Sequence, residues 1–144
     1  MQISPNNFLA LDVGNKRIGV AIANEVARLP RPLTTLNNDG TVWDQIKSLI
    51  RSHEASTIVV GLPRGLEGQE TEQTTLTREF VEKLKTIATV DVFLQDEALT
   101  SHQAETELAK AGKIYDKSAI DALAATYILE DFLNNQSVKT GEQR

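Results

Sequence analysis

The sequence contains no cysteine and only two histidines, His53 and His102, among its 144 residues. The lack of cysteine excludes disulfide bonds and thiolate metal sites, and so few histidines disfavour a histidine-rich zinc site. Any bound metal would therefore be held by oxygen ligands. Such ligands favour hard cations, which here means Mg²⁺ or Mn²⁺.

Long apolar runs and an excess of positive charge are missing as well. No stretch approaches membrane-spanning length, and the N-terminus lacks the basic region and apolar run of a signal peptide. We therefore expect a cytoplasmic protein with no membrane partner. The net charge of −5 argues against a large basic surface for nucleic acid. If nucleic acid is the partner, the affinity should be moderate or transient.

The length fits one domain, which we expect over residues 1–133, followed by a polar, flexible tail at 134–144. The run at 57–61 has no polar alternation and is typical of a buried parallel strand, whereas a turn at 13–16 indicates an antiparallel hairpin. Strands are expected near 8–11, 18–23, 31–36, 57–61 and 90–95, and helices near 42–50, 76–87, 100–110 and 118–133. This order predicts an α/β fold with a five-stranded mixed sheet and helices on both faces. A ribonuclease H-like fold has this arrangement, but so do other α/β folds.

Three carboxylates fall where side chains project beyond a sheet. Asp12 ends the first apolar strand, Glu97 ends the last strand, and Asp121 lies in the first turn of the final helix. Together they could hold two divalent ions and hydrolyse a phosphodiester bond. Each also has a plainer interpretation: Asp12 as a turn residue, Glu97 as a solvated acid and Asp121 as a helix cap.

Glu97 is preferred to its neighbour Asp96 for two reasons. Successive strand residues face opposite sides of a sheet, so one of the pair points toward Asp12 and the other away. If two strand spacings separate the backbones, the gap is roughly 10 Å, which a longer side chain closes more easily. Whether Asp96 also contacts metal stays open.

Four segments in register resemble the YqgF/RuvX family, whose members are provisionally described as pre-16S rRNA nucleases or Holliday junction resolvases. They are LALDVGNKRIGVA at 9–21, VVGLP at 59–63 with Gly68 downstream, DEALTS at 96–101 and IDALAA at 120–125. The resemblance runs from about residue 8 to 133 and implies a ribonuclease H-like fold. It also implies a metal-dependent nuclease active in 5′-end maturation of precursor 16S rRNA, with Asp12, Glu97 and Asp121 as catalytic metal ligands.

The sequence departs from the family pattern at Ala98, where an arginine is usual, and at Ser101, where a threonine is usual. The first change removes a cation that would hold a phosphate or orient an acid. Lys16 and Arg17, in the turn beside Asp12, could supply the missing positive charge, and Arg64 and Lys117 are further candidates for binding substrate. Each could equally be an ordinary solvated side chain.

Other functions stay open at this point. A Holliday junction resolvase-like DNA endonuclease would use the same carboxylates, and a non-catalytic RNA-binding factor of ribosome assembly would keep the fold without turnover. The segment Asp12-Val13-Gly14 also resembles the phosphate loop of sugar kinases, but those enzymes need two lobes and this chain has room for one. The oligomeric state, monomer or homodimer, is not readable, although resolving a junction would require two sites.

Overall fold

The computed structural model describes residues 6–97 and 117–142, with side chains up to residue 136 but without that of residue 117. The strands are β1 (Asn7–Val13), β2 (Arg17–Asn24), β3 (Arg31–Asn37), β4 (Ala55–Pro63) and β5 (Asp91–Glu97). The helices are α1 (Val42–Ser52), α2 (Glu72–Ile87) and α4 (Lys117–Glu142). The helix expected near 100–110 lies outside the described residues.

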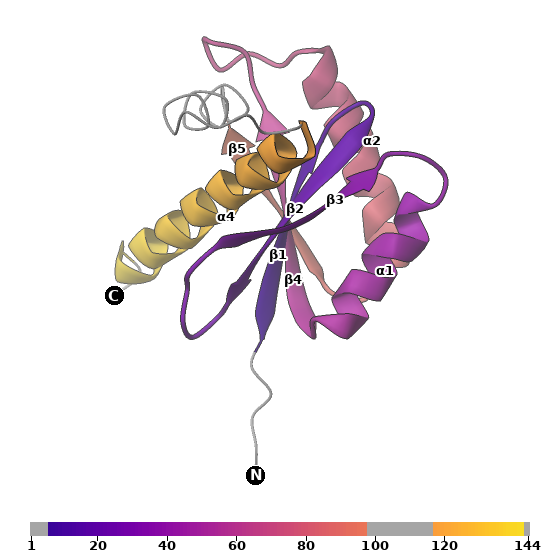
Figure 1. The fold of residues 1–144 in the computed structure, drawn as a ribbon. Helices are drawn as coiled ribbons and strands as arrows, with labels where there is room; N and C mark the ends of the chain where they lie inside the picture. Colours follow the sequence, from indigo (N-terminus) through magenta and orange to yellow (C-terminus); the bar gives the residue numbers. More distant parts are fainter. Residues whose placement is uncertain (1–5, 98–116, 143–144) are drawn as a thin grey trace, which may run out of the picture.

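The strands form one five-stranded sheet in the order β3-β2-β1-β4-β5. β1 pairs with β2, and β2 with β3, in antiparallel fashion, whereas β1 pairs with β4 and β4 with β5 in parallel. Figure 1 shows α1 and α2 on one side of this sheet and α4 on the other. The predicted mixed sheet with helices on both faces is therefore confirmed.

Alternation along β1 divides the interior into two cores. Leu9, Leu11 and Val13 belong to the core shared with α1 and α2, and Phe8 and Ala10 to the core shared with α4. Since side chains alternate strictly along a strand, Asp12 falls on the α4 side. The fold thus directs this carboxylate toward the long C-terminal helix.

Two glycines allow α4 to approach the sheet closely. A Cβ atom at Gly19 of β2 would collide with the backbone of Asp121, and one at Gly61 of β4 would collide with the side chain of Ile128. Side chains at these positions would hold the helix away from the strands. The glycines therefore set the height at which α4 lies above the sheet.

The C-terminal helix is longer than the sequence analysis predicted. We expected it to end near Leu133, but α4 continues to Glu142. No proline or glycine interrupts the chain before Gly141, and the Asn135 amide donates a hydrogen bond to the Gln95 side chain at 3.2 Å. The prediction relied on polar composition and therefore ended the helix too early. A polar segment that contains no proline or glycine can continue a helix.

Candidate functional site

Asp12 and Asp121 are brought together at one end of the sheet by β2. Gly19 is the partner of Asp12 in the antiparallel register, and the backbone of Asp121 lies directly on that glycine. Burial raises the pKa of Asp12 to about 6, and the negative charge of Asp121 adds to the shift. Both residues were predicted for the site, and their backbones meet through a single glycine.

Glu97 lies on the same side of the sheet as Asp12. Phe93 and Gln95 share this face of β5, and both contact α4. The ring centroids of Phe93 and Phe132 are 5.7 Å apart, and the Gln95 side chain accepts a hydrogen bond from Asn135. Burial is the main cause that raises the pKa of Glu97 to about 9; a hydrogen bond with Asp131 and the charges of Asp131, Asp12 and Asp96 contribute further. Among the described residues, the buried Oε1 atom of Glu97 has no hydrogen-bond partner.

Asp96 points to the opposite side and is bound there. Its Oδ1 atom is 3.3 Å from the Arg64 guanidinium, and 68% of its side chain is exposed. Asp96 thus takes part in a surface ion pair, whereas Glu97 lies half-buried on the side of Asp12. Asp96 and Glu97 thus lie on opposite faces, as strand alternation predicted, and the role of Glu97 as a metal ligand stays a prediction.

Asp131 is a fourth carboxylate that the sequence analysis did not single out. It lies in α4 and shares a hydrogen bond with Glu97. No local sequence pattern marks Asp131, because its proximity to Glu97 depends on how α4 crosses β5. The one available signal is its position three residues after Ile128, a residue expected to face inward.

The four basic candidates differ in what they contact. Lys16 is exposed in the hairpin turn, whereas the Nε atom of Arg17 donates to Oδ2 of Asp121 at 2.7 Å. Arg64 is bound to Asp96 and Glu70 at 3.3 Å each. Residue 117 begins α4, but its side chain lies outside the description. Two of the predicted phosphate-binding cations therefore already have acidic partners.

The carboxylate oxygens of Asp12, Glu97 and Asp121 suit a hard divalent cation, although the three side chains do not point to a common position. Within residues 6–97 and 117–142, no three acidic or histidine side chains lie close enough together to hold a metal. Asp121 is bound to Arg17 and Glu97 to Asp131, with Asp12 as the electrostatic neighbour of both acids. A cation would satisfy the Oε1 atom of Glu97, to which no described residue forms a hydrogen bond, and would relieve the crowding that raises both pKa values.

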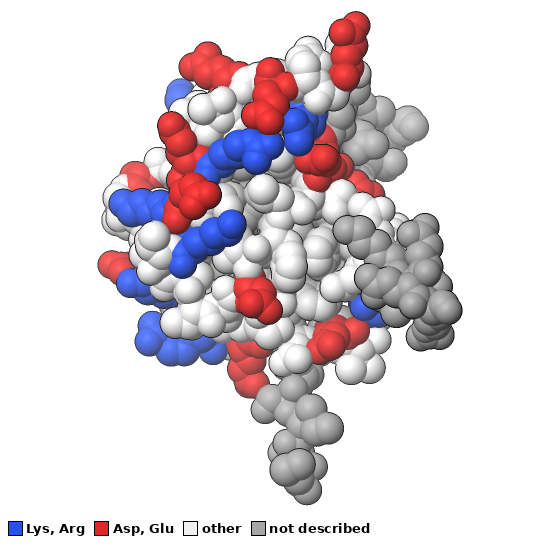
Figure 2. Space-filling model, turned by 180° about the vertical axis from the view of Figure 1, so that it is seen from behind, with Lys and Arg blue, Asp and Glu red and all other residues white. Residues whose placement is uncertain are grey.

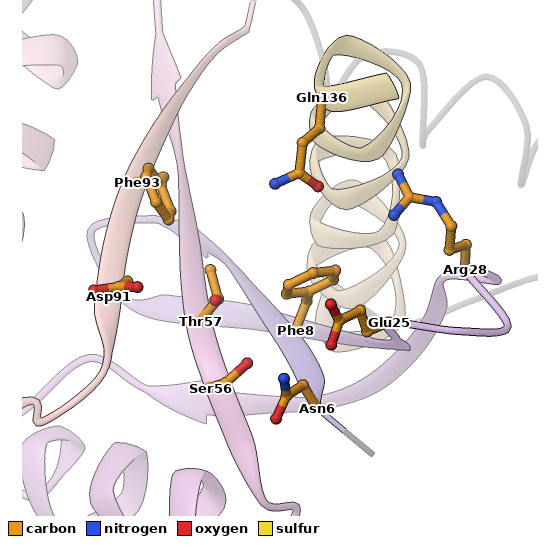
Figure 3. Close-up of a pocket in the computed structure, with 9 residues that line it drawn as sticks. All are labelled: Asn6, Phe8, Glu25, Arg28, Ser56, Thr57, Asp91, Phe93 and Gln136. Atoms are coloured by element: carbon orange, nitrogen blue, oxygen red, sulfur yellow. The ribbon is translucent and has the colours of Figure 1, made fainter. Parts of the chain in front are cut away.

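A separate cavity of about 680 Å³ lies at the other end of the sheet, where β1, β4 and β5 begin. Figure 3 shows Phe93 and Phe8 on its wall, with Asp91 and Glu25 on opposite sides and Arg28 next to α4. Arg28 donates a hydrogen bond to the Leu133 carbonyl at 2.9 Å. None of the four carboxylates described above lines this cavity, so it is separate from the candidate site.

The surface charge agrees with the acidic composition. On the face shown in Figure 2, acidic and basic side chains are interspersed, and no broad basic area is visible on the described part of the chain. A large electrostatic footprint for nucleic acid is thus missing from this face.

Comparison with known proteins identifies the family. The sequence model of the RuvX family, described as a Holliday junction resolvase, matches residues 6–135. The chain belongs to the RuvX family. Its relatives include a protein of Sulfurihydrogenibium sp., 40% identical over 92% of each chain, and one of Roseiflexus sp., 37% identical over 94% of this chain and 99% of the other. Both relatives carry the provisional name pre-16S rRNA nuclease.

Solved structures place this RuvX chain in the ribonuclease H-like fold class. Thermus thermophilus RuvC in complex with a Holliday junction substrate matches 90% of this chain and 96% of its own length, with a TM-score of 0.54 and 14% identity. RuvC from the same organism in a second structure gives a TM-score of 0.52 at 12% identity. The expected fold class is confirmed, and membership of this nuclease family makes the protein a hydrolase of phosphodiester bonds.

Proposed function

We propose that this RuvX-family protein is a divalent-metal-dependent nuclease that uses Asp12, Glu97 and Asp121 as its catalytic metal ligands. One observation carries the proposal: Asp12 pairs with Gly19, the backbone of Asp121 packs on that glycine, and Glu97 lies on the same side of the sheet. These three acids, far apart in sequence, thus lie toward the α4 side of the sheet, and we propose that a bound cation draws their side chains together.

The proposed ions are Mg²⁺ or Mn²⁺, acting as a pair. When bound, they would supply a nucleophilic water and neutralise the charge that develops on the phosphate. Asp12 is the electrostatic neighbour of both Asp121 and Glu97, so it would hold the metal together with these two acids. Lys16 is exposed in the turn just after β1, and we propose that it contacts a neighbouring phosphate of the substrate.

Precursor 16S rRNA is the substrate we propose, with processing at its 5′ end in the cytoplasm. The relatives' name supports this substrate, and the acidic surface fits an enzyme that meets RNA transiently. Branched DNA is the second candidate, because the family is described as a Holliday junction resolvase and the fold is shared with RuvC. In the described part of the chain, no helix is long and apolar enough to cross a bilayer.

A cleavage assay with paired substrates tests this proposal. Labelled precursor 16S rRNA and a four-way DNA junction are incubated with the protein and Mg²⁺, Mn²⁺ or a chelator. We expect cutting of the rRNA only with metal, and at least a hundredfold loss in Asp12→Asn and Glu97→Gln, in line with the loss of an essential catalytic group. Selective cutting of the junction would make DNA the substrate instead.

Asp96→Asn is the matched control for Glu97→Gln. It removes one negative charge from the neighbouring residue, whose side chain binds Arg64 on the opposite side of the sheet. Cleavage by Asp96→Asn should stay close to that of the unmodified protein. Equal losses in both variants would show that general charge, and not a ligand role for Glu97, matters at this strand end. RNA binding with no cleavage in any metal would favour an assembly factor over an enzyme.

A further inference from the structure

Arg17 forms the shortest ion pair among the described residues, and its partner is one of the proposed ligands. The Nε atom lies 2.7 Å from Oδ2 of Asp121, and only 30% and 22% of the two side chains are exposed. A charge-assisted bond that is partly shielded from water is stronger than an exposed one. The pair joins residues 104 positions apart in the chain, so it fixes tertiary geometry rather than a local turn.

The backbone of Asp121 is fixed by the same strand. Arg17 and Gly19 are two residues apart in β2 and therefore project from the same face. Gly19 receives the Asp121 backbone, and the Thr35 hydroxyl of the adjacent strand β3 donates to the Ser118 carbonyl at 2.6 Å. The start of α4 is thus attached to β2 and β3 by its main chain, and Arg17 adds the contact that orients the Asp121 side chain.

Orientation is needed here because Asp121 lies beside another acid. The charge of Asp121 acts on Asp12, so the two carboxylates repel each other and would tend to turn apart. The Arg17 bond occupies Oδ2 and leaves Oδ1 as the oxygen that this contact does not use. A side chain that bonds one oxygen of a metal-binding carboxylate can hold the other in place for the ion.

We propose that Arg17 is a positioning residue that holds the Asp121 carboxylate beside Asp12, and that it acts through Asp121 instead of gripping the substrate phosphate itself. The role of this contact in catalysis rests on the proposed function. Lys16 provides the internal comparison, because it has the same charge in the adjacent position but is exposed in the turn. If Arg17 binds the substrate phosphate, its substitution should affect Mn²⁺ affinity as little as substitution of Lys16. If Arg17 is a positioning residue, its substitution should weaken Mn²⁺ binding as substitution of Asp121 does.

A double-mutant cycle separates these roles. The variants are Arg17→Gln, Asp121→Asn, the double variant and Lys16→Gln, with Arg17→Lys as a second test that keeps the charge and protects folding. Mn²⁺ affinity is measured by calorimetry, and the urea midpoint is measured in the absence of metal. Loss of an outer partner of a metal ligand typically weakens binding about 10- to 100-fold. We therefore expect Arg17→Gln to weaken Mn²⁺ binding at least tenfold, with a smaller loss in Arg17→Lys.

The decisive comparison is between the double variant and Asp121→Asn alone. If Arg17 acts through Asp121, the two bind Mn²⁺ equally, and the effects on the urea midpoint are not additive. Lys16→Gln should leave Mn²⁺ affinity unchanged. Unchanged or tighter Mn²⁺ binding in Arg17→Gln, or additive losses in the double variant, would overturn the positioning role. The urea cycle needs neither metal nor RNA, so a protein that binds no Mn²⁺ would refute the nuclease proposal while the Arg17–Asp121 coupling is still measured.

Discussion

At the scale of single residues, Asp12 and Glu97 make the stability of the metal-free protein depend on pH. The folded state raises both pKa values, to about 6 and about 9, mainly through burial. Folding therefore binds protons at these groups more tightly than the unfolded chain does. Their contribution to stability is complete below the ordinary carboxyl pKa and is lost as the pH rises through the folded value.

We predict that the melting temperature of metal-free protein falls faster between about pH 5 and about pH 9 than that of Asp12→Asn or Glu97→Gln. Asp12→Asn should remove the part of the decline near pH 6, and Glu97→Gln the part that extends toward pH 9. Thermal melts in a chelator at closely spaced pH values measure this difference. Profiles of both variants that run parallel to that of the unmodified protein would contradict the assigned burial of these acids.

At the scale of elements, the close approach of α4 to β2 requires a glycine at position 19. A methyl group there meets the main chain of Asp121, which cannot move without shifting the helix. At Gly61 the obstacle is the Ile128 side chain, which can change rotamer, and at Gly40 there is nothing within 4 Å. Forcing extra atoms into a packed contact costs roughly 1–3 kcal/mol.

The three alanine substitutions should therefore rank in a fixed order. We predict that Gly19→Ala lowers the free energy of unfolding by about 2 kcal/mol or more, Gly61→Ala by less, and Gly40→Ala hardly at all. Gly19→Ala should also weaken Mn²⁺ binding, because it displaces Asp121. Urea denaturation with calorimetry provides both measurements. Equal stability of Gly19→Ala and Gly40→Ala would refute the close approach of α4 to β2.

The elements themselves were predictable because their signals are local. The apolar runs of β1 and β4 and the turn between β1 and β2 are each encoded in a few consecutive residues, and strand alternation then placed Glu97, rather than Asp96, on the face of the sheet that carries Asp12. The role of Gly19, the pairing of Arg17 with Asp121 and the presence of Asp131 depend on the path of α4 across the sheet. That path is set by packing between segments about a hundred residues apart, which a pattern in one sequence does not display.

At the scale of the whole molecule, the net charge of −5 and the acidic partners of Arg17 and Arg64 predict that RNA affinity depends only weakly on salt. Each phosphate contact to a single strand contributes a slope of about −0.7 in a plot of log affinity against log salt. Even if Lys16, Arg17, Arg64 and Lys117 all bound phosphates, the slope would be about −3. Since Arg17 and Arg64 are bound to acids, we expect a shallower value.

Fluorescence anisotropy with labelled precursor RNA and the inactive Asp12→Asn variant measures this slope. Lys16→Gln should reduce its magnitude by about 0.7, as expected for one lost phosphate contact. Arg64→Gln should change it less, because Arg64 is held by Asp96 and Glu70. A slope steeper than about −5 would mean that basic residues other than these four candidates dominate binding.

The most direct test of the central claim is anomalous diffraction from crystals of the protein grown with Mn²⁺. The account predicts an anomalous peak in contact with the Asp12 carboxylate and with an oxygen of Asp121 or Glu97, and no such peak in Asp12→Asn crystals. A bound Mn²⁺ elsewhere on the protein, or no bound Mn²⁺ at saturating concentration, would contradict it.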